Sequence, residues 1–505
     1  PSAGVTRYPC PVEPGLSSQR AFRPRRATAC FTRHTILQEL GAVVNESSQP
    51  AGQNMFVILP LKCYNNTDQN CVRRGRGHMT LEEYLGTLAG KTVAVIGVGV
   101  SNTPLIRLLR GAGIAVTACD KKDREALGSL AEELEAIGCA LRLGPDYLED
   151  LQADVIFRTP GLHPKYLEAA RRRGSRITSE MEVFFQVCPC PIIAVTGSDG
   201  KTTTTTIIAG LLRAAGRTVH LGGNIGHPLL NEAGAIRRED LAVVELSSFQ
   251  LMTMDRSPAV AVLTNLAPNH LDVHTDMAEY VAAKANIFAH QGTGDRLVTN
   301  WDNDLTRELA EQAPGRVEWF TRDALHVPER GCFLKVGTIW YRDGAESRPV
   351  LPLEDILLPG VHNVENYMAA ICAVQGLVDD ETIRGYARTF GGVEHRIELV
   401  RTRRGVRWYN DSIASSPSRT MAGLRAFPEK VILIAGGKDK GVSYAPLGPV
   451  INDHVKAMVL CGATAGAIRR AAQEAENFQN IPILEAEDYP AAVAAADRLA
   501  QPGDV

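Results

Sequence analysis

A glycine-rich stretch, PIIAVTGSDGKTTTTT at residues 191–206, contains the residue types that bind nucleotide phosphates. The β-branched residues before Thr196 predict a buried strand, and Gly200-Lys201-Thr202 opens a segment with a helical pattern. Backbone N–H groups of such a turn and the positive end of the next helix attract phosphate, while Lys201 adds charge and the Thr202 hydroxyl suits Mg²⁺. The alternative is a turn that only joins strand to helix, which does not require the Lys-Thr pair. We predict a short-form phosphate loop, with Val195 where the longer pattern has glycine, made of Gly197, Ser198, Asp199, Gly200, Lys201, Thr202 and Thr203.

Three more polar residues of this region are candidates for metal binding. Glu245 ends the apolar run LAVVE, so its carboxylate lies at the end of a predicted buried strand, where it can share Mg²⁺ with Thr202 and a γ-phosphate. His270 lies in NHLDVH, and Lys284 lies on an apolar helical face in EYVAAKANIF. Taken singly, each has an ordinary alternative: a helix-capping glutamate, a structural histidine, and a lysine that extends to solvent. The residues alone leave these alternatives open for His270 and Lys284.

A third group of polar residues follows in the last part of the chain. Asn366 lies in HNVEN, Arg396 in EHRIE and Asp411 in YNDS. An asparagine side chain can read a purine edge, an arginine can bind polyphosphate, and an aspartate can accept hydrogen bonds from ribose hydroxyls. Each residue alone equally fits a capping or surface role, so their meaning depends on whether separate domains meet over one nucleotide.

Length and composition limit the classes of protein that this chain can be. Its 505 residues suggest about three domains, and 45% hydrophobic with 22% charged residues is ordinary for a globular protein. No apolar run reaches the roughly 18 residues of a membrane helix, and eleven scattered cysteines without paired C-x-x-C motifs indicate reduced thiols. From Met79 onward, 53 acidic residues exceed 44 basic ones, which argues against a nucleic-acid partner. We predict a soluble, cytoplasmic protein with neither a membrane nor a nucleic-acid partner.

The first 78 residues do not have the pattern of a folded domain. They show neither a helical nor a strand period and mix Pro, Arg, Asn and Ser. Their ten Lys or Arg exceed four Asp or Glu, so a transit peptide is one interpretation, although the chain starts at Pro1. We predict that residues 1–78 are a non-native or disordered leader and that Met79 resembles a natural start.

The segment 79–189 has the pattern of a Rossmann-like domain. TVAVIGVGVSN predicts a strand, a glycine turn and a helix from about Pro104 to Arg110, and a second strand ends at Asp120. Asn102 occupies the third glycine position of a dinucleotide fingerprint, so a nicotinamide cofactor has weak support, and another nucleotide fits the same turn. A further strand ends in the loop of Thr159, at a predicted ligand-binding edge.

Two more α/β units follow, at 190–392 and 393–505. The continuous apolar runs DLAVVEL, AVAVLTNL and RLVTN, separated by helical patterns, predict a mostly parallel sheet covered on both faces. After Gly392, HRIELVRTRRGVRWYNDS predicts two strands joined at Arg404-Gly405, and further apolar runs alternate with helices. The predicted fold is therefore α/β with three domains: a Rossmann-like first domain, a central phosphate-loop ATPase-like domain with a parallel sheet, and a Rossmann-like C-terminal domain.

Taken together, the motifs resemble those of one enzyme family. TGSDGKTTT, VELSSFQL, NHLDVH, AAKANIF, LPGVHNVENYMAA, EHRIE and YNDS occur in the order seen in Mur ligases, the ATP-dependent amino-acid ligases of cell-wall precursor synthesis. The resemblance covers residues 79–505 and is greatest to the member that joins D-glutamate to UDP-N-acetylmuramoyl-L-alanine through an acyl phosphate. It implies these two compounds as substrates and ATP and Mg²⁺ as cofactors. We also expect a monomer.

The resemblance implies roles for individual residues. The phosphate loop, with Asn366, Arg396 and Asp411, would bind ATP. Thr202 and Glu245 would bind one Mg²⁺, while His270 and carbamylated Lys284 would bind a second, because a bare ammonium would repel the ion and a carbamate offers anionic oxygen. The catalytic candidates are Lys201, His270 and Lys284. The substrate-binding candidates are Gly97, Gly99, Ser101, Asn102, Asp120, Thr159, Asn224 and Lys440.

Two departures from the family pattern affect these roles. Ile413 stands where many relatives have lysine in N-D-S-x-A, and the candidate substitutes are Arg419, Lys438 and Lys440. The chain ends at Gly-Asp-Val, before the family segment that helps hold D-glutamate, so we expect a fragment that binds ATP and the uridine substrate but ligates poorly. The alternatives are a sister ligase or folylpolyglutamate synthase-like enzyme with another amino acid, a phosphate-loop regulatory NTPase, and a dehydrogenase that uses residues 97–120.

Overall fold

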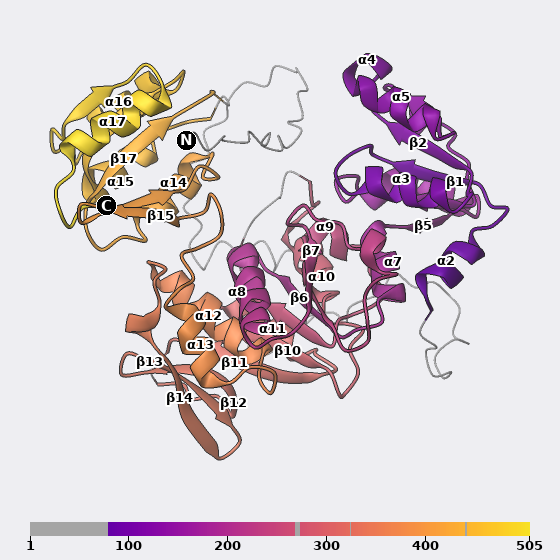
Figure 1. Cartoon of the computed structure of the whole chain (residues 1–505), viewed down its shortest axis with the longest axis horizontal. Helices are drawn as coiled ribbons and strands as arrows, with labels where there is room; N and C mark the ends of the chain where they lie inside the picture. The colour runs from indigo at the N-terminus through magenta and orange to yellow at the C-terminus, as the bar shows by residue number, and fades with distance from the viewer. Residues whose placement is uncertain (1–78, 268–272, 324, 440–441) are drawn as a thin grey trace, which may run out of the picture. The chain divides into compact units, whose positions relative to one another are not determined.

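A computed structural model gives the fold of this chain and describes residues 79–267, 273–323, 325–439 and 442–505 (Figure 1). The predicted leader of residues 1–78 lies outside the described residues. Within the described ranges, no helix is both long enough and apolar enough to cross a membrane.

Five parallel strands form the first sheet, in the order β3-β2-β1-β4-β5. The helix before it starts at a capping box, in which the Thr80 hydroxyl accepts from the Glu83 N–H and the Glu83 carboxylate accepts from the Thr80 N–H. All four residues of β1 are buried, as expected for a central parallel strand. The elements are α2 (Leu81–Thr87), β1 (Val93–Ile96), α3 (Asn102–Gly111), β2 (Val116–Asp120), α4 (Arg124–Leu127), α5 (Ser129–Ala136), β3 (Ala140–Leu143), β4 (Val155–Phe157), η2 (Pro164–Leu167), α6 (Glu168–Arg172), β5 (Arg176–Thr178) and α7 (Glu180–Val187).

Nine strands form the second sheet, in the order β14-β13-β12-β11-β10-β9-β6-β8-β7. Neighbours from β12 to β7 are parallel, whereas β13 and β14 extend the sheet as antiparallel strands. Because β6 pairs with both β8 and β9, its carboxyl end lies inside the parallel part of the sheet. The elements are β6 (Ile192–Thr196), α8 (Lys201–Ala214), β7 (Val219–Gly223), η3 (Leu230–Glu232), β8 (Leu241–Glu245), α9 (Ser248–Leu251), β9 (Val260–Leu263), α10 (Met277–Ala285), β10 (Arg296–Asn300), α11 (Asp304–Ala310), β11 (Arg316–Thr321), β12 (Arg330–Lys335), β13 (Thr338–Asp343), β14 (Glu346–Pro352), η4 (Leu353–Asp355), α12 (Val361–Ala373) and α13 (Asp380–Ala387).

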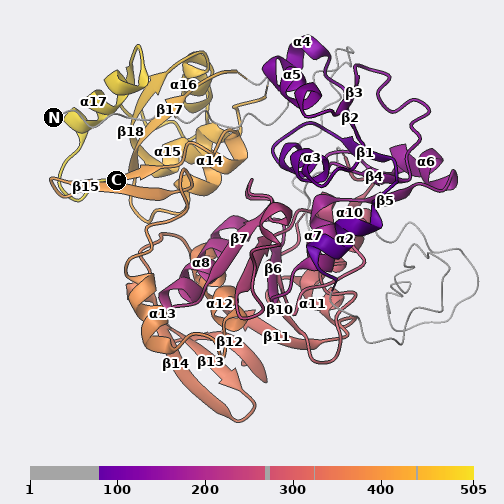
Figure 2. The same ribbon diagram turned by 45° about the vertical axis from the view of Figure 1, so that its right-hand side comes forward.

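Helices cover both faces of the second sheet (Figure 2). Ile193 and Val195 of β6 join an apolar cluster with residues of α8 and α12, whereas Ala194 joins a cluster on the other face with residues of α10 and α11. Helices α8 and α12 pack against each other. Burial on both faces is the reason that these strands are continuously apolar rather than alternating.

The last part of the chain contains a hairpin and a small parallel sheet. Arg404 and Gly405 both have positive φ, at 53° and 78°, which fits the tight turn of a two-residue hairpin loop between β15 and β16. Strands β17, β18 and β19 pair in parallel. The elements are β15 (Glu398–Arg403), β16 (Val406–Asn410), α14 (Pro417–Leu424), β17 (Val431–Gly436), α15 (Leu447–His454), β18 (Val455–Cys461), α16 (Ala465–Gln473), β19 (Ile483–Glu485) and α17 (Tyr489–Leu499).

The α/β fold class predicted from the sequence is confirmed. Strand β2 ends at Asp120 and the hairpin turns at Arg404-Gly405, as the sequence predicts. The extension of the second sheet through β11 to β14 was not predicted, because charged residues and glycines interrupt the apolar pattern between residues 316 and 352. The domain boundaries at 189/190 and 392/393 stay predictions.

Candidate nucleotide-binding site

The predicted phosphate loop lies between the carboxyl end of β6 and the start of α8. Its two glycines have positive φ, 149° at Gly197 and 79° at Gly200, and neither has room for a side chain. A Cβ at Gly197 would lie 1.9 Å from Thr264 Oγ1, and one at Gly200 would lie 2.4 Å from Asn366 Oδ1. The loop therefore requires glycine at both positions for conformation and for space.

Residues at the end of β9 hold the loop in place. The N–H of Ser198 donates to Asn265 O at 2.9 Å, and the N–H of Asp199 donates to Asn265 Oδ1 at 2.9 Å. Thr264 Oγ1 donates to Asp199 O at 2.6 Å. The N–H of Thr204 in α8 donates to Gly200 O. The N–H groups before Thr204 lie in the first turn of the helix, where no helical carbonyl can accept from them. The residues after β9 therefore hold the loop, and the first N–H groups of α8 remain as donors that suit a phosphate.

The side chain of Lys201 folds back against the loop. Its Nζ donates to Gly197 O at 3.0 Å and to Ser198 O at 2.9 Å. Burial lowers the pKa of Lys201, and the carboxylates of Glu245 and Asp199 oppose that shift. The ammonium thus lies at the loop, among the groups that a phosphate would contact.

Glu245 ends β8 next to the loop and is 2% exposed. Its Oε1 accepts from Asn224 Nδ2 at 2.8 Å, whereas its buried Oε2 has no hydrogen-bond partner in the described part of the chain. A buried carboxylate oxygen without a partner is costly unless a cation or donor meets it. Glu245 therefore fits the oxygen ligand that Mg²⁺ requires. The described ranges contain no group of three His, Cys, Asp or Glu side chains placed to hold a metal, and the predicted ligand His270 lies outside them.

Lys284 lies in α10 and, contrary to the usual behaviour of lysine on an apolar face, does not extend to solvent. It is 2% exposed, and its Nζ donates to Thr196 Oγ1 at 3.2 Å and to Gly197 O at 2.8 Å. The ring of Tyr280 lies 4.9 Å from Nζ. Burial holds the pKa of Lys284 well below its usual value, and the nearby Lys201 ammonium lowers it further. The two lysines therefore lie together under the loop.

The structure adds residues that the sequence analysis did not single out. Tyr280 OH lies 2.8 Å from Ser198 Oγ of the loop. His274, the second histidine of NHLDVH, is 2% exposed, and its Nε2 lies 2.9 Å from Ser248 Oγ at the start of α9. The sequence feature that could have pointed to His274 is the presence of two histidines in NHLDVH. These contacts tie α9 and α10 to the phosphate loop.

The three predicted nucleotide contacts of the later chain have different surroundings. Asn366 of α12 meets the loop directly, since its Oδ1 accepts from Thr204 Oγ1 at 3.1 Å. Burial lowers the pKa of Arg396, and its Nε has no hydrogen-bond partner in the described part of the chain. Burial raises the pKa of Asp411, whereas the hydrogen bond from the Ile397 N–H and the Arg396 charge lower it. Asn366 thus joins the loop, and Arg396 and Asp411 interact with each other.

The first predicted turn, after β1, is closed by its own side chains. Asp120 accepts from the N–H of Val98 at 2.7 Å, and Asn102 Nδ2 donates to Ile96 O at 2.8 Å. A Cβ at Gly97 would lie 2.9 Å from Thr159 Cβ. The structure therefore brings together all six substrate candidates that lie in the part of the chain forming the first sheet: Gly97, Gly99, Ser101, Asn102, Asp120 and Thr159. Asn224 instead contacts Glu245, and Lys440 lies outside the described residues.

Two domain families and several enzymes are similar to this chain. Residues 195–374 match the Mur ligase middle domain, and residues 395–505 match the Mur ligase, glutamate ligase domain. The UDP-N-acetylmuramoylalanine--D-glutamate ligase of Acetivibrio thermocellus is 50% identical over 433 residues, which cover 84% of this chain and 92% of the relative. The enzyme of the same name from Ruminiclostridium cellulolyticum is 46% identical over 431 residues, with coverage of 84% and 92%. Among solved structures, UDP-N-acetylmuramate-alanine ligase from Thermotoga maritima has a TM-score of 0.49 at 18% identity, covering 79% of this chain and 91% of that one.

Proposed function

Since this chain belongs to the Mur ligase family, we propose that it joins D-glutamate to UDP-N-acetylmuramoyl-L-alanine while ATP is converted to ADP and phosphate. The names of relatives that are 50% and 46% identical over most of the chain support this choice of substrates. The observation that carries the chemistry is the buried Glu245 carboxylate, one oxygen of which has no partner among the described residues, beside a glycine loop that bears Lys201. A carboxylate beside a phosphate loop needs a cation, and ATP binds together with Mg²⁺.

We infer that the start of α8 binds the ATP phosphates. Within the loop from Gly197 to Thr203, the N–H groups at the start of α8 and the positive end of that helix would bind the phosphates, because the N–H groups of Ser198 and Asp199 already bond to Asn265. Lys201 would turn from its loop carbonyls toward the phosphates and offset their charge. Thr202 and Glu245 would hold Mg²⁺, which neutralises phosphate charge when bound. Asn366, Arg396 and Asp411 would contact the rest of the nucleotide.

Lys284 has a proposed role that its burial supports. A depressed pKa favours the neutral amine, and the neutral amine is the form that adds to CO₂, giving a carbamate and releasing one proton. The lysine then becomes an anion beside Lys201 in place of a second positive charge. The carbamate would hold a second Mg²⁺ together with His270.

The reaction follows from what a carboxylate can do. Its negative charge makes it a poor electrophile, so an amine does not attack it directly. We propose that a carboxylate oxygen of UDP-N-acetylmuramoyl-L-alanine attacks the γ-phosphorus of ATP, so that ADP leaves and an acyl phosphate forms. The amine of D-glutamate then attacks the acyl carbon, phosphate leaves with the former carboxylate oxygen, and the amine loses a proton. Lys201 would offset the repulsion between the two anions before the first step.

We propose that the uridine nucleotide binds at the turn after β1, in a first domain that spans residues 79–189. Gly97, Gly99, Ser101, Asn102, Asp120 and Thr159 would line its site. Asn224 would contact the muramoyl part from the central domain at 190–392, and Lys440 would act from the C-terminal domain at 393–505. We expect the enzyme to act as a monomer in the cytoplasm.

The assay that tests this function measures phosphate release from ATP with each substrate omitted in turn. We expect release only when UDP-N-acetylmuramoyl-L-alanine and an amino acid are both present, with D-glutamate the most active of a panel. Release stimulated by another amino acid would indicate a sister ligase. Hydrolysis of ATP that neither substrate stimulates would indicate a regulatory NTPase and would contradict the proposal.

A further inference from the structure

A cavity of about 500 Å³ lined by four arginines lies on the second sheet, away from the phosphate loop. Arg296, Arg316 and Arg330 line it from the first residues of β10, β11 and β12. These strands run parallel to β6, and the phosphate loop follows the last residue of β6. The cavity therefore lies at the amino edge of the sheet and the phosphate loop at the carboxyl edge, and β9 lies between β6 and the three strands of the cavity.

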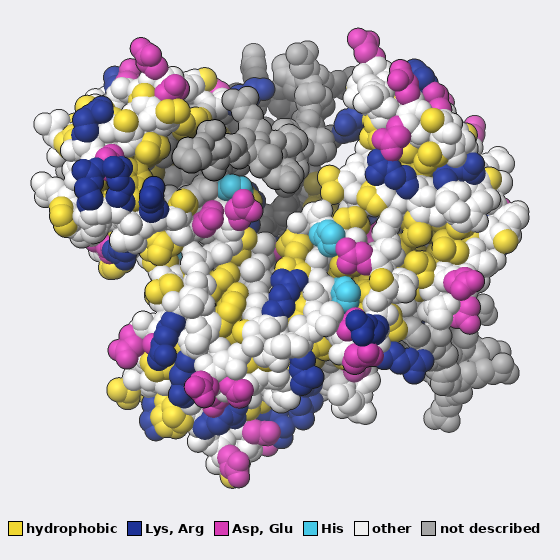
Figure 3. Space-filling model, viewed as in Figure 1, with side chains coloured by type: hydrophobic (Ala, Val, Ile, Leu, Met, Phe, Trp, Pro, Cys, Tyr) yellow, Lys and Arg dark blue, Asp and Glu magenta, His cyan; other side chains and the backbone are white. Residues whose placement is uncertain are grey.

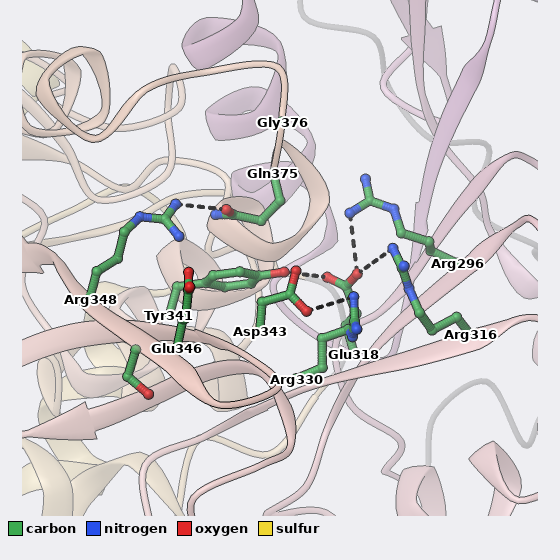
Figure 4. A pocket seen from close by; sticks show the side chains of 11 residues that line it. Arg296, Arg316, Glu318, Arg330, Tyr341, Asp343, Glu346, Arg348, Gln375 and Gly376 are labelled. Atoms are coloured by element: carbon green, nitrogen blue, oxygen red, sulfur yellow. Dashed lines mark hydrogen bonds and ion pairs between the residues drawn. The ribbon is translucent and has the colours of Figure 1, made fainter.

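A buried carboxylate orients the arginines of this cavity (Figure 4). Glu318 is 0% exposed, and its Oε1 lies 3.4 Å from Arg296 Nη1 and 3.1 Å from Arg316 Nη2. The hydroxyl of Tyr341 donates to Oε2 of Glu318 at 3.4 Å. The carboxylate of Glu318 thus faces the guanidinium groups of Arg296 and Arg316, and these three groups together carry a net charge of +1.

The guanidinium groups keep hydrogen-bond donors for a ligand. Each guanidinium has five N–H donors in a fixed plane. Among the described residues, Arg316 pairs only with Glu318, and 48% of its side chain is exposed. Arg330 pairs with Asp343 at 2.7 Å, and Arg348 pairs with Asp380 at 2.8 Å and also donates to Gln375 at 2.9 Å. Spare, oriented donors of several guanidinium groups around one cavity match the oxygens of a phosphate.

The positive charge of the cavity is local to Arg296 and Arg316, which share the single carboxylate of Glu318. The carboxylates of Asp343 and Asp380 balance Arg330 and Arg348, and the carboxylate of Glu346 also lines the cavity. Lys and Arg side chains mixed with Asp and Glu side chains also cover the surface over β12 to β14 (Figure 3). The volume is within the range of small-molecule sites, so the cavity suits a compact ligand rather than a macromolecule.

We propose that this cavity is a second anion site, which binds a compact phosphate-bearing ligand through Arg316 and Arg330, independently of the phosphate loop. Glu318 holds Arg296 and Arg316 in position, and the hydroxyl of Tyr341 satisfies its second oxygen. The ligand chemistry is that of a phosphate or diphosphate group, either free or carried on a small molecule such as a nucleotide.

The test is calorimetric titration of pyrophosphate into the whole protein at physiological salt. The Lys201→Ala variant serves as the background, because it weakens the phosphate loop as a competing site. We expect this background to bind pyrophosphate with a Kd below about 1 mM. Adding Arg316→Gln or Arg330→Gln should weaken binding at least about tenfold. Arg316→Gln leaves Glu318 paired with Arg296, and Arg330→Gln leaves only the half-exposed Asp343 without its partner.

The matched control is Arg388→Gln, which removes an exposed arginine that pairs with Asp355 and does not line the cavity. It should leave the Kd unchanged. Titration of ADP distinguishes the two sources, since binding as tight as that of pyrophosphate indicates a nucleotide-borne diphosphate and weaker binding indicates the free ion. Equal loss of affinity in Arg388→Gln, or no loss in both cavity variants that melt like the parent, would overturn the proposal. So would the absence of binding in the Lys201→Ala background.

Discussion

The turn after β1 and the turn after β6 have the same topology but have side chains of opposite charge bonded to them. Each joins a buried parallel strand to a helix and uses a glycine with positive φ, 87° at Gly97 and 149° at Gly197. Under the first turn lies the carboxylate of Asp120, bonded to the Val98 N–H. Beneath the second lies the ammonium of Lys201, bonded to loop carbonyls. A shared backbone shape therefore does not imply a shared ligand.

The two turns also differ in whether their carboxylates are satisfied. Both oxygens of Asp120 accept backbone N–H bonds, from Val98 at 2.7 Å and from Lys122 at 2.9 Å. Glu245, beside the second turn, keeps a buried oxygen without a partner in the described chain. The hydrogen bonds of Asp120 at the first turn are thus complete, whereas Glu245 beside the second turn has an oxygen available for a cation. This contrast fits our proposal that the first turn binds the uridine nucleotide and the second binds the triphosphate of ATP with its metal.

The largest expected effect comes from removing the ammonium of Lys201 at the second turn. Lys201→Ala should lower kcat of ligation by about 10³-fold, because it removes the charge that offsets the γ-phosphate. Lys122→Ala is the matched change beside the first turn, because Lys122 follows β2, its side chain is exposed and its backbone N–H bonds to Asp120. It should change kcat by less than about twofold. Steady-state phosphate release measures both, and similar losses in the two variants would remove the contrast.

Lys284→Ala should lower kcat by about 10²-fold, if the lysine acts as an anionic oxygen ligand. Acetate or bicarbonate, which offer an oxygen anion of similar size, should partly restore the activity. The thermal melt of the variant serves as the control for folding, since the side chain is buried. Unchanged activity in Lys284→Ala would exclude the carbamate, and Thr202 and Glu245 would then be the only proposed pair of metal ligands at the second turn.

A smaller effect is expected at the first turn. Asp120→Asn replaces one acceptor oxygen by an NH₂ group, so the N–H of Val98 or of Lys122 loses its partner. The cost should be about 1–3 kcal/mol of unfolding free energy. KM for the uridine substrate should rise while kcat stays within about twofold of the parent. A fall in kcat with an unchanged KM would place Asp120 in the chemical step instead.

The smallest effect is a pH dependence outside both turns, at Glu180 of α7. Burial raises its pKa to about 7, although its Oε1 accepts from the Leu230 N–H at 2.8 Å. Because the folded state holds this proton more tightly than the unfolded state, stability is lost as the pH rises from about 4.5 through 7. Glu180→Gln keeps an acceptor for Leu230 and removes the titration. Between pH 5 and pH 8 the melting temperature of the parent should fall more than that of the variant, and parallel curves would contradict the assignment.

The parts of this molecule that local pattern determines were predictable from the sequence. The phosphate loop is such a part, because Gly197, Gly200 and Lys201 act within one strand-turn-helix unit. The contact between Asn224 and Glu245 was not predictable, since it depends on the pairing of β7 with β8. The arginines that start β10, β11 and β12 likewise form no motif, and only the parallel sheet brings them to one edge.

Lys284 was predictable from the sequence only in part. Its helical, apolar setting was visible in the sequence, but physical reasoning alone favoured extension to solvent. Burial beneath the loop requires Thr196 and Gly197 as partners, which lie almost ninety residues earlier in the chain. Tertiary structure therefore overrides the usual preference of a lysine.

The most direct test of the account follows the oxygen atoms of the substrate. UDP-N-acetylmuramoyl-L-alanine labelled with ¹⁸O in its carboxylate is incubated with ATP, Mg²⁺ and D-glutamate, and the released phosphate is analysed by mass. Activation of the carboxylate by the second turn predicts one ¹⁸O atom in each phosphate released, because the acyl phosphate passes its bridging oxygen to phosphate when the amine attacks. Ligation that releases phosphate without label would contradict the account.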